Sequence, residues 1–237
     1  MPLTELKLTP LPSAPYGGST ITTSWKYLGA THQSVSGLFD ALHVLRLKGQ
    51  QAKAESRGKL SADEQDLLRA ALVFTSSGLD ACLTRLLRDT LPALVATDGA
   101  AEKQFKKWVS TRLDNKVSAE LRQAILDGDP RARLVELYVK VISTPSLQAT
   151  GDLRTVRDAL GLTAAQVSDH LVDDLAPFFA ARNEIAHELD LVDPTGPGTP
   201  SRRQRGMEAV RTQCDDVLAF VATIIQAAVR AVRAGRS

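Results

Sequence analysis

The sequence predicts an all-α protein, a helical bundle preceded by an irregular N-terminal extension. Apolar residues recur at spacings of three and four over most of the chain, as on one face of a helix, and no convincing set of strands is visible. Of the 237 residues, 43% are hydrophobic, which is enough to bury a sizeable core. We therefore expect an extension over residues 1–32 and one helical domain over residues 33–237.

The N-terminal extension is expected to lack regular structure. Pro10, Pro12, Pro15 and the pair Gly17-Gly18 interrupt any regular period there. The first helix is expected from about Ser34 to Gly49, where leucines recur at helical spacing, and a polar connection then runs to Leu60.

A long helix is predicted to begin directly after Ser61. The Ser61 hydroxyl can accept from the first-turn amides while the Glu64 carboxylate reaches back to the cap, which is the capping-box arrangement. The apolar positions that follow share one helix face and are Leu68, Leu72, Leu79, Cys82, Leu83 and Leu86.

Shorter helices are predicted further along the chain. Four helical patterns end at breaks rich in Gly, Pro or Asp, and they cover residues 102–113, 118–126, 131–142 and 148–160. Thr163 and Gln166 form a second capping box, which predicts a helix to about Asp174.

Two more helices complete the predicted bundle. Pro177 is compatible with the first turn of a helix, because its missing amide hydrogen would be unpaired there anyway. Prolines and glycines in residues 193–200 then forbid helix, and Ser201 is predicted to cap a last helix that runs to about Val232.

Charge and cysteine content narrow the classes of function. The net charge of +2 arises from 29 basic and 27 acidic residues, so any RNA site must be a local patch rather than a global field. Cys82 and Cys214 lie in apolar helical patterns without a nearby Cys or His at metal-ligand spacing. We interpret them as core residues in a reducing cytosol.

The sequence gives no indication of secretion or of a membrane span. Residues 1–25 lack a continuous apolar stretch after a basic start. The longest uncharged run, residues 217–229, is too short to cross about 30 Å of hydrocarbon and fits a buried helix. We expect a cytoplasmic protein with no membrane partner.

The most informative segment runs from Arg182 to His187, with Asn183 between them. At about 100° per residue, Asn183 and His187 lie about 40° apart around a helix, and Arg182 lies about 100° from Asn183, so the three can line one cavity. Arginine can hold a phosphate through two hydrogen bonds, and histidine is the residue type that titrates near neutrality. A different arc of this helix is expected to pack into the bundle, and it carries Phe178, Ile185 and Leu189.

This segment resembles the Arg-x4-6-His signature of HEPN-domain ribonucleases, in its Arg-Asn-x-x-x-His form. The resemblance implies metal-independent RNA cleavage to 2′,3′-cyclic phosphate and 5′-hydroxyl ends. It also implies a toxin or effector in prokaryotic toxin-antitoxin or antiphage systems, with an antitoxin or other regulatory partner. An earlier segment, Gly78-Leu79-Asp80, resembles the HEPN helix that carries an acidic residue facing the site, so Asp80 is expected to orient His187 or Arg182.

The residue types fit that chemistry without a cofactor. His187 would act as general base on a ribose 2′-hydroxyl or as general acid to the 5′-oxygen, Arg182 would neutralise the phosphate, and Asn183 would orient the scissile group or the imidazole. One helix offers one histidine. A two-fold homodimer with both motifs in one cleft would supply the second.

Three alternatives remain open at this stage. Arg182 could pair with Glu184, Asp190 or a neighbouring helix, while His187 is a satisfied histidine near a helix end. The chain could instead be a non-catalytic HEPN-like module that binds RNA, a nucleotide or a protein. An unrelated helical scaffold is the third reading.

Two basic clusters are candidate RNA contacts. The first cluster comprises Lys103, Lys106 and Lys107. Aromatic residues that can stack on bases alternate with these lysines. A solvated helix with Trp108 turned to the core is the stronger interpretation. The second opens the predicted last helix, where the helix dipole disfavours cations, which suggests a phosphate or acidic partner; it comprises Arg202, Arg203 and Arg205. No metal site is expected, because His43 and His170 lack a second ligand at useful spacing.

Overall fold

A computed structural model describes residues 5–16, 19–52, 59–115, 117–193, 195–196 and 199–235. Apart from one isolated β-bridge, the regular secondary structure of the described part is α-helix, so the predicted all-α class is confirmed. The helices are α1 (Ser19–Ala52), α2 (Ala62–Thr97), α3 (Gly99–Asp114), α4 (Ala119–Ile125), α5 (Pro130–Ser143), α6 (Thr150–Ala159), α7 (Asp169–Asp173), α8 (Ala176–Glu188) and α9 (Met207–Ala234).

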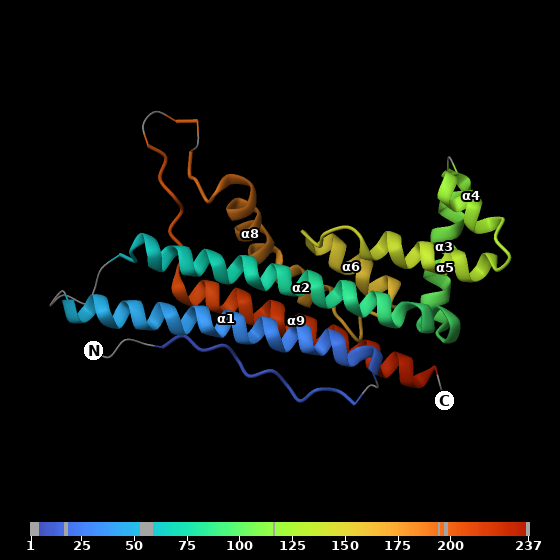
Figure 1. Ribbon diagram of the computed structural model, residues 1–237, viewed down its shortest axis with the longest axis horizontal. Helices are drawn as coiled ribbons and strands as arrows, with labels where there is room; N and C mark the ends of the chain where they lie inside the picture. Colours follow the sequence, from blue (N-terminus) through green and yellow to red (C-terminus); the bar gives the residue numbers. More distant parts are fainter. Residues whose placement is uncertain are drawn as a thin grey trace.

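The three longest helices, α1, α2 and α9, run side by side along the long axis of the molecule (Figure 1). Most residues of α9 between Val217 and Val232 are buried, so α9 is the central helix of the core. α1 and α2 make the most extensive helix contact, and they pack tightly where Gly78 faces Thr31: a Cβ at Gly78 would lie 2.2 Å from the Thr31 side chain. Ser76-Ser77-Gly78 therefore serves close helix packing.

α1 begins at Ser19, so the prediction of a helix from Ser34 was wrong at its N-terminal end, and the expected domain boundary at residue 32 falls inside α1. Propensity is a weak guide there: Ile21 and Leu28 are buried in the core, and tertiary packing of an amphipathic face outweighs the β-branched residues around them. The residues before α1 run along it (Figure 1), and Leu6 and Leu8 are buried. Gly17 and Gly18 lie outside the described residues.

The capping box at Ser61 is present, so the predicted start of the long helix is confirmed. The second capping box does not open a helix. Gln166 accepts from the amide of Thr163 at 2.8 Å, but the chain makes only a turn, and α7 starts later, with Ser168 as its cap. Val167 is buried after this turn, which interrupts the helical path.

The last helix also starts later than predicted, at Met207 rather than after Ser201. The preceding residues are extended because they pair with the end of the α8 region: the amide of Val192 donates to Ser201 at 2.8 Å, and the amide of Arg203 donates to Asp190 at 2.8 Å. A local capping signal at Ser201 is outweighed by this ladder.

α3, α4 and α5 form a projecting unit at the far end of the bundle from α8 (Figure 1). Its interior is aromatic, with the rings of Trp108 and Tyr138 5.2 Å apart and those of Phe105 and Tyr138 5.6 Å apart. By length and composition α2 and α9 are each apolar enough to cross a membrane, but the most apolar windows of these core helices are 50% and 67% buried inside the protein. The absence of a membrane partner stays a prediction.

Candidate functional site

α8 carries the Arg182 motif and is fixed to the bundle by one face. Pro177 lies in its first turn, as predicted, and Phe178, Phe179 and Ala181 are buried against the core. These contacts leave the motif on the side of α8 that is not packed into the bundle.

α8 ends directly after the motif in a left-handed turn. Leu189 and Asp190 both have positive φ, 51° and 61°, which residues with a Cβ adopt only when surrounding contacts hold them. The amide of Asp190 donates to the Glu184 carbonyl at 3.0 Å and closes the turn. This conformation points Leu189 outward, 65% exposed, so its predicted packing in the bundle was wrong.

Asp190 is a fully buried carboxylate held by two arginines. The Arg69 Nε atom lies 2.8 Å from Asp190 Oδ2, and Arg205 hydrogen-bonds both carboxylate oxygens. Burial acts to raise the pKa of the Asp190 carboxyl, but the hydrogen bonds and charges of Arg205 and Arg69 outweigh it, so the pKa is lowered from its ordinary value. This ion cluster fixes the left-handed turn to α2 and to the segment before α9.

The other carboxylates of α8 also have arginine partners. Glu184 Oε2 lies 2.7 Å from Arg205 Nη2, and Glu184 Oε1 lies 3.4 Å from Arg203 Nε. Glu188 Oε2 lies 3.4 Å from Arg203 Nη1. Arg203 and Arg205 belong to the second basic cluster, for which a phosphate or acidic partner was expected. Their acidic partners are carboxylates of the same chain.

Arg182 is left without a carboxylate in the described part of the chain. Its one hydrogen bond runs from Nη1 to the Asn183 side-chain oxygen at 3.0 Å, and the side chain is only half-buried. The expected alternative, an ion pair from Arg182 to Glu184 or Asp190, was wrong, because Arg69, Arg203 and Arg205 occupy those two carboxylates. The remaining guanidinium N–H groups of Arg182 are available to an anion.

His187 is exposed in the last turn of α8 and has no hydrogen-bond partner among the described residues. Asp80 does not make the expected contact with the motif: its carboxylate accepts the Leu147 amide at 3.1 Å. The next residue along, Gln148, accepts a long 3.5 Å hydrogen bond from the Asn183 amide. Asp80 thus holds the segment that borders Asn183 instead of the imidazole.

The structure does not bring the first basic cluster to the motif. Lys103, Lys106 and Lys107 lie on α3, at the far end of the bundle from α8 (Figure 1), and Lys106 pairs with Glu102 at 3.2 Å. Trp108 packs on Tyr138 inside α3–α5, so it is not free to stack on a base, as the solvated-helix interpretation predicted.

Of the second basic cluster, Arg202 pairs with Asp66 at 3.0 Å, and both other arginines join the carboxylates of the α8 region. All three lie before α9 and not in its first turns, where the sequence prediction had placed them. They hold the site together and are not open cations.

No group of three His, Cys, Asp or Glu side chains suited to a metal ion occurs within the described ranges. Cys82 and Cys214 are buried, as predicted, and burial raises the pKa of both thiols to about 12. They are unreactive core residues.

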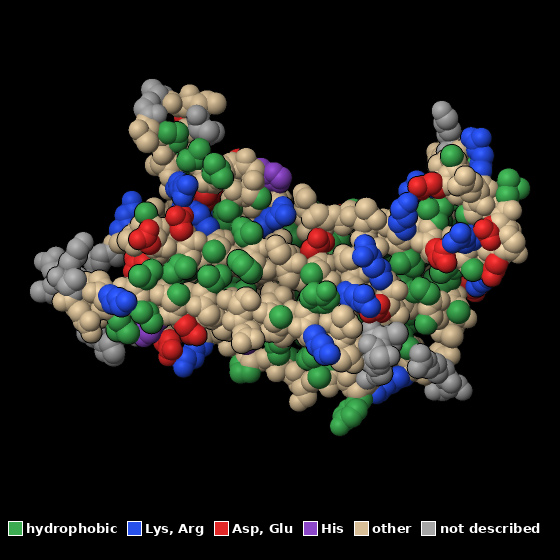
Figure 2. Space-filling model, viewed as in Figure 1, with side chains coloured by type: hydrophobic (Ala, Val, Ile, Leu, Met, Phe, Trp, Pro, Cys, Tyr) green, Lys and Arg blue, Asp and Glu red, His purple; other side chains and the backbone are tan. Residues whose placement is uncertain are grey.

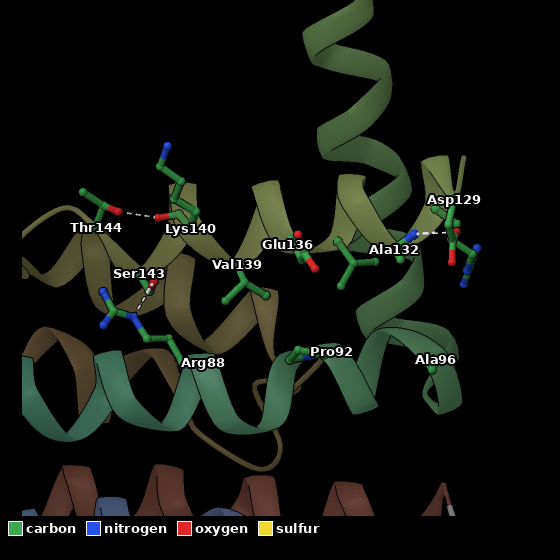
Figure 3. A pocket seen from close by; sticks show the side chains of 12 residues that line it. Arg88, Pro92, Ala96, Asp129, Ala132, Glu136, Val139, Lys140, Ser143 and Thr144 are labelled. Carbon is green, nitrogen blue, oxygen red and sulfur yellow. Dashed lines mark hydrogen bonds between the residues drawn. The ribbon is translucent and has the colours of Figure 1, made fainter. Parts of the chain in front are cut away.

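A groove of about 770 Å³ between α2 and α5 was missed by the sequence reasoning (Figure 3). Its floor is apolar, with Pro92 and Val139, and Arg88 and Lys140 stand at its edge. The Arg88 Nε atom donates to the Ser143 hydroxyl at 3.3 Å across the groove. A proline inside α2 was the available signal, since it removes a helix hydrogen bond and allows a local opening.

No protein-family model, curated protein or solved structure matches this chain. The function must therefore be argued from the site itself.

Proposed function

We propose that this protein is a metal-independent endoribonuclease whose site is formed by Arg182, Asn183 and His187. One observation carries the proposal: Arg182 has no carboxylate partner in the described part of the chain, the neighbouring carboxylates are bound by other arginines, and His187 of the same helix is exposed. A cation kept free in an otherwise paired ion network is suited to an anionic ligand. The resemblance to HEPN ribonucleases supports the same reading.

The mechanism follows from the residue types. His187 removes the proton from a ribose 2′-hydroxyl, the 2′-oxygen attacks the phosphorus, and the P–O5′ bond breaks as the 5′-oxygen gains a proton. Arg182 stabilises the charge that develops on the phosphoryl oxygens, and Asn183 holds the guanidinium in place. The products are a 2′,3′-cyclic phosphate and a 5′-hydroxyl. The proton for the 5′-oxygen comes from a second His187 in a homodimer or from water, which reaches the exposed site.

The biological setting is proposed from the resemblance alone. A chain of this kind would act in the cytoplasm as a toxin or effector in toxin-antitoxin or antiphage defence. An antitoxin or another regulatory protein would then control access to α8, where the motif is open to solvent.

RNA cleavage by the purified chain tests the proposal. End-labelled single-stranded RNA should be cut in EDTA, and His187→Ala and Arg182→Ala should each lose about 10²-fold or more in rate. His170→Ala is the matched control, because His170 is also exposed and lies on the neighbouring α7. A rate in either site variant equal to wild type, or activity that needs an added divalent cation, would contradict the mechanism.

A non-catalytic RNA-binding module is the second candidate. It is favoured by the lack of a hydrogen-bond partner that would orient His187 among the described residues. Retained RNA affinity that depends on Arg182, with no cleavage by wild-type protein, would select this function.

A further inference from the structure

The outer face of α1 and α2 has no covering segment in the described part of the chain. Residues 5–16 lie along α1 and bind α9 through Thr9 and Asp215, and α8 and α6 pack on another side of α2. The open face instead exposes apolar side chains, with Phe74 52% and Leu45 39% exposed. Its apolar residues include Leu38, Ala41, Leu45, Leu67, Ala70 and Phe74.

The middle of this face carries no ionic side chain. Within residues 27–45 and 67–84, the only acidic or basic side chains of the Asp, Glu, Lys and Arg types are Asp40, Arg69 and Asp80. Arg69 and Asp80 bind other segments of the chain, and Asp40 lies about 200° around α1 from Leu38. Figure 2 shows hydrophobic and uncharged side chains over the middle of α1 and α2. Burying such a face removes apolar surface from water without desolvating an ion.

The charges at the two ends of the face are complementary. Asp63 and Arg85 each lie 11 residues from Phe74 along α2, about 16 Å to either side and on the same side of the helix. Asp63 is exposed and has no ion-pair partner among the described residues, while Arg85 is half-exposed and pairs with Asp89 at 2.7 Å.

We propose that a second copy of this chain packs on this face, with α2 antiparallel to α2 about a two-fold axis at Phe74. That axis places Arg85 of each copy opposite Asp63 of the other, and an isologous contact repeats the pair. Because this face carries no net charge, it can pack against a copy of itself. It has no cluster of like charges that would bind a nucleic acid or a charged protein.

The size of the face suits a dimer. From Tyr27 to Leu45 it is about 27 Å long, and two helices are about 20 Å wide, which is a footprint of about 540 Å² per partner, the size of a small, reversible interface. It is a different surface from the cleft between two copies of α8 that would bring two His187 side chains together, so in this dimer the proton for the 5′-oxygen comes from water. Asp80, which supports the segment beside Asn183, lies about 120° around α2 from Phe74. The inference does not rest on the proposed nuclease activity.

Sedimentation velocity of the full chain tests the dimer and its register. Asp63→Lys and Arg85→Glu should each raise the dimer Kd at least about tenfold, because each places two like-charge pairs in the contact. The double variant Asp63→Lys/Arg85→Glu should return the Kd to within about threefold of wild type, since both pairs are restored. Rescue of this kind cannot come from misfolding.

Phe74→Glu should give a monomer with an unchanged helical circular dichroism spectrum. Val44→Glu is the matched control, because Val44 is 47% exposed on another side of α1 and should leave the dimer intact. A wild-type chain that stays monomeric at about 100 µM would overturn the proposal. Single charge variants that dimerise like wild type would also overturn it. So would a monomeric chain that binds neutral lipid vesicles in a flotation assay and loses this binding in Phe74→Glu.

Discussion

Arg182 is the residue on which the proposed site depends. Its replacement by lysine separates the effect of the guanidinium geometry from the effect of the positive charge. Lysine would keep a positive charge at this position but would lose the planar fork that holds a phosphate through two hydrogen bonds. Arg182→Lys should therefore keep most of the RNA affinity of the wild type while losing about 10²-fold in cleavage rate. Fluorescence anisotropy and single-turnover cleavage measure the two quantities separately. Equal losses in both would show that Arg182 acts through binding alone.

Asp190 determines the stability of the turn that follows His187. Asp190→Asn removes the charge that offsets Arg69 and Arg205 in a buried site, and breaking such a pair costs about 3–5 kcal/mol. Urea denaturation at neutral pH should show this loss in the free energy of unfolding. Asp66→Asn is the control: Asp66 also pairs with Arg69 but is 55% exposed, so its loss should cost no more than about 1 kcal/mol.

The pH dependence of this difference follows from the lowered pKa of Asp190. Its stabilising contribution is complete above the unfolded-state pKa of about 3.9 and is lost as the pH falls through the lower folded-state pKa. The gap between wild type and Asp190→Asn should therefore be constant from neutral pH to about pH 5 and close below about pH 4. A gap that closed near neutrality would assign the effect to another group.

At the scale of the element, Gly78 permits the close contact between α1 and α2. Gly78→Ala would place a Cβ 2.2 Å from the Thr31 side chain, so the helices must separate, and overpacking of this kind costs about 1–3 kcal/mol. Thr31→Ala in the same chain should recover part of the loss, because it removes the two atoms that are closest.

Gly37→Ala is the matched control within α1. A Cβ there meets nothing within 4 Å, so alanine should stabilise the helix by about 0.5–1 kcal/mol. Thermal unfolding of these three variants and the wild type decides the point. Destabilisation by Gly37→Ala equal to that by Gly78→Ala would mean that the loss is not due to the α1–α2 contact.

Element boundaries could be predicted from the sequence where local contacts decide them. The reciprocal cap of Ser61 and Glu64 places the start of α2, and Pro177 marks the first turn of α8. The starts of α1 and α9 could not be predicted in this way. Burial of Ile21 in the core and pairing of Ser201 with Val192 both depend on contacts distant in the sequence.

In the candidate site, too, local features could be predicted from the sequence and contacts between distant residues could not. Arg182, Asn183 and His187 share one helix, and their spacing alone predicts that they lie close together. The free charge of Arg182 depends on Arg69, 121 residues before Asp190, and on other arginines that take the nearby carboxylates. Such competition for partners is a tertiary property that no local pattern contains.

At the scale of the whole molecule, charge is balanced and most cations near α8 are already paired. The net charge is +2, and around the motif Arg69, Arg203 and Arg205 bind carboxylates of the chain. A protein that neutralises few phosphates releases few counterions, so its RNA affinity changes little with salt.

Salt dependence of RNA binding therefore gives a whole-molecule prediction. With about one or two phosphates neutralised, log K for single-stranded RNA should fall against log salt with a slope of about −0.7 to −1.4. The His187→Ala chain avoids cleavage during the titration, and adding Arg182→Ala should reduce the slope by about 0.7. Lys103→Ala is the control and should leave the slope unchanged, since α3 lies at the far end of the bundle. A slope steeper than about −3 would mean that more phosphates are neutralised than Arg182 can account for. A slope that changes with Lys103→Ala and not with Arg182→Ala would place the RNA on α3 instead of α8.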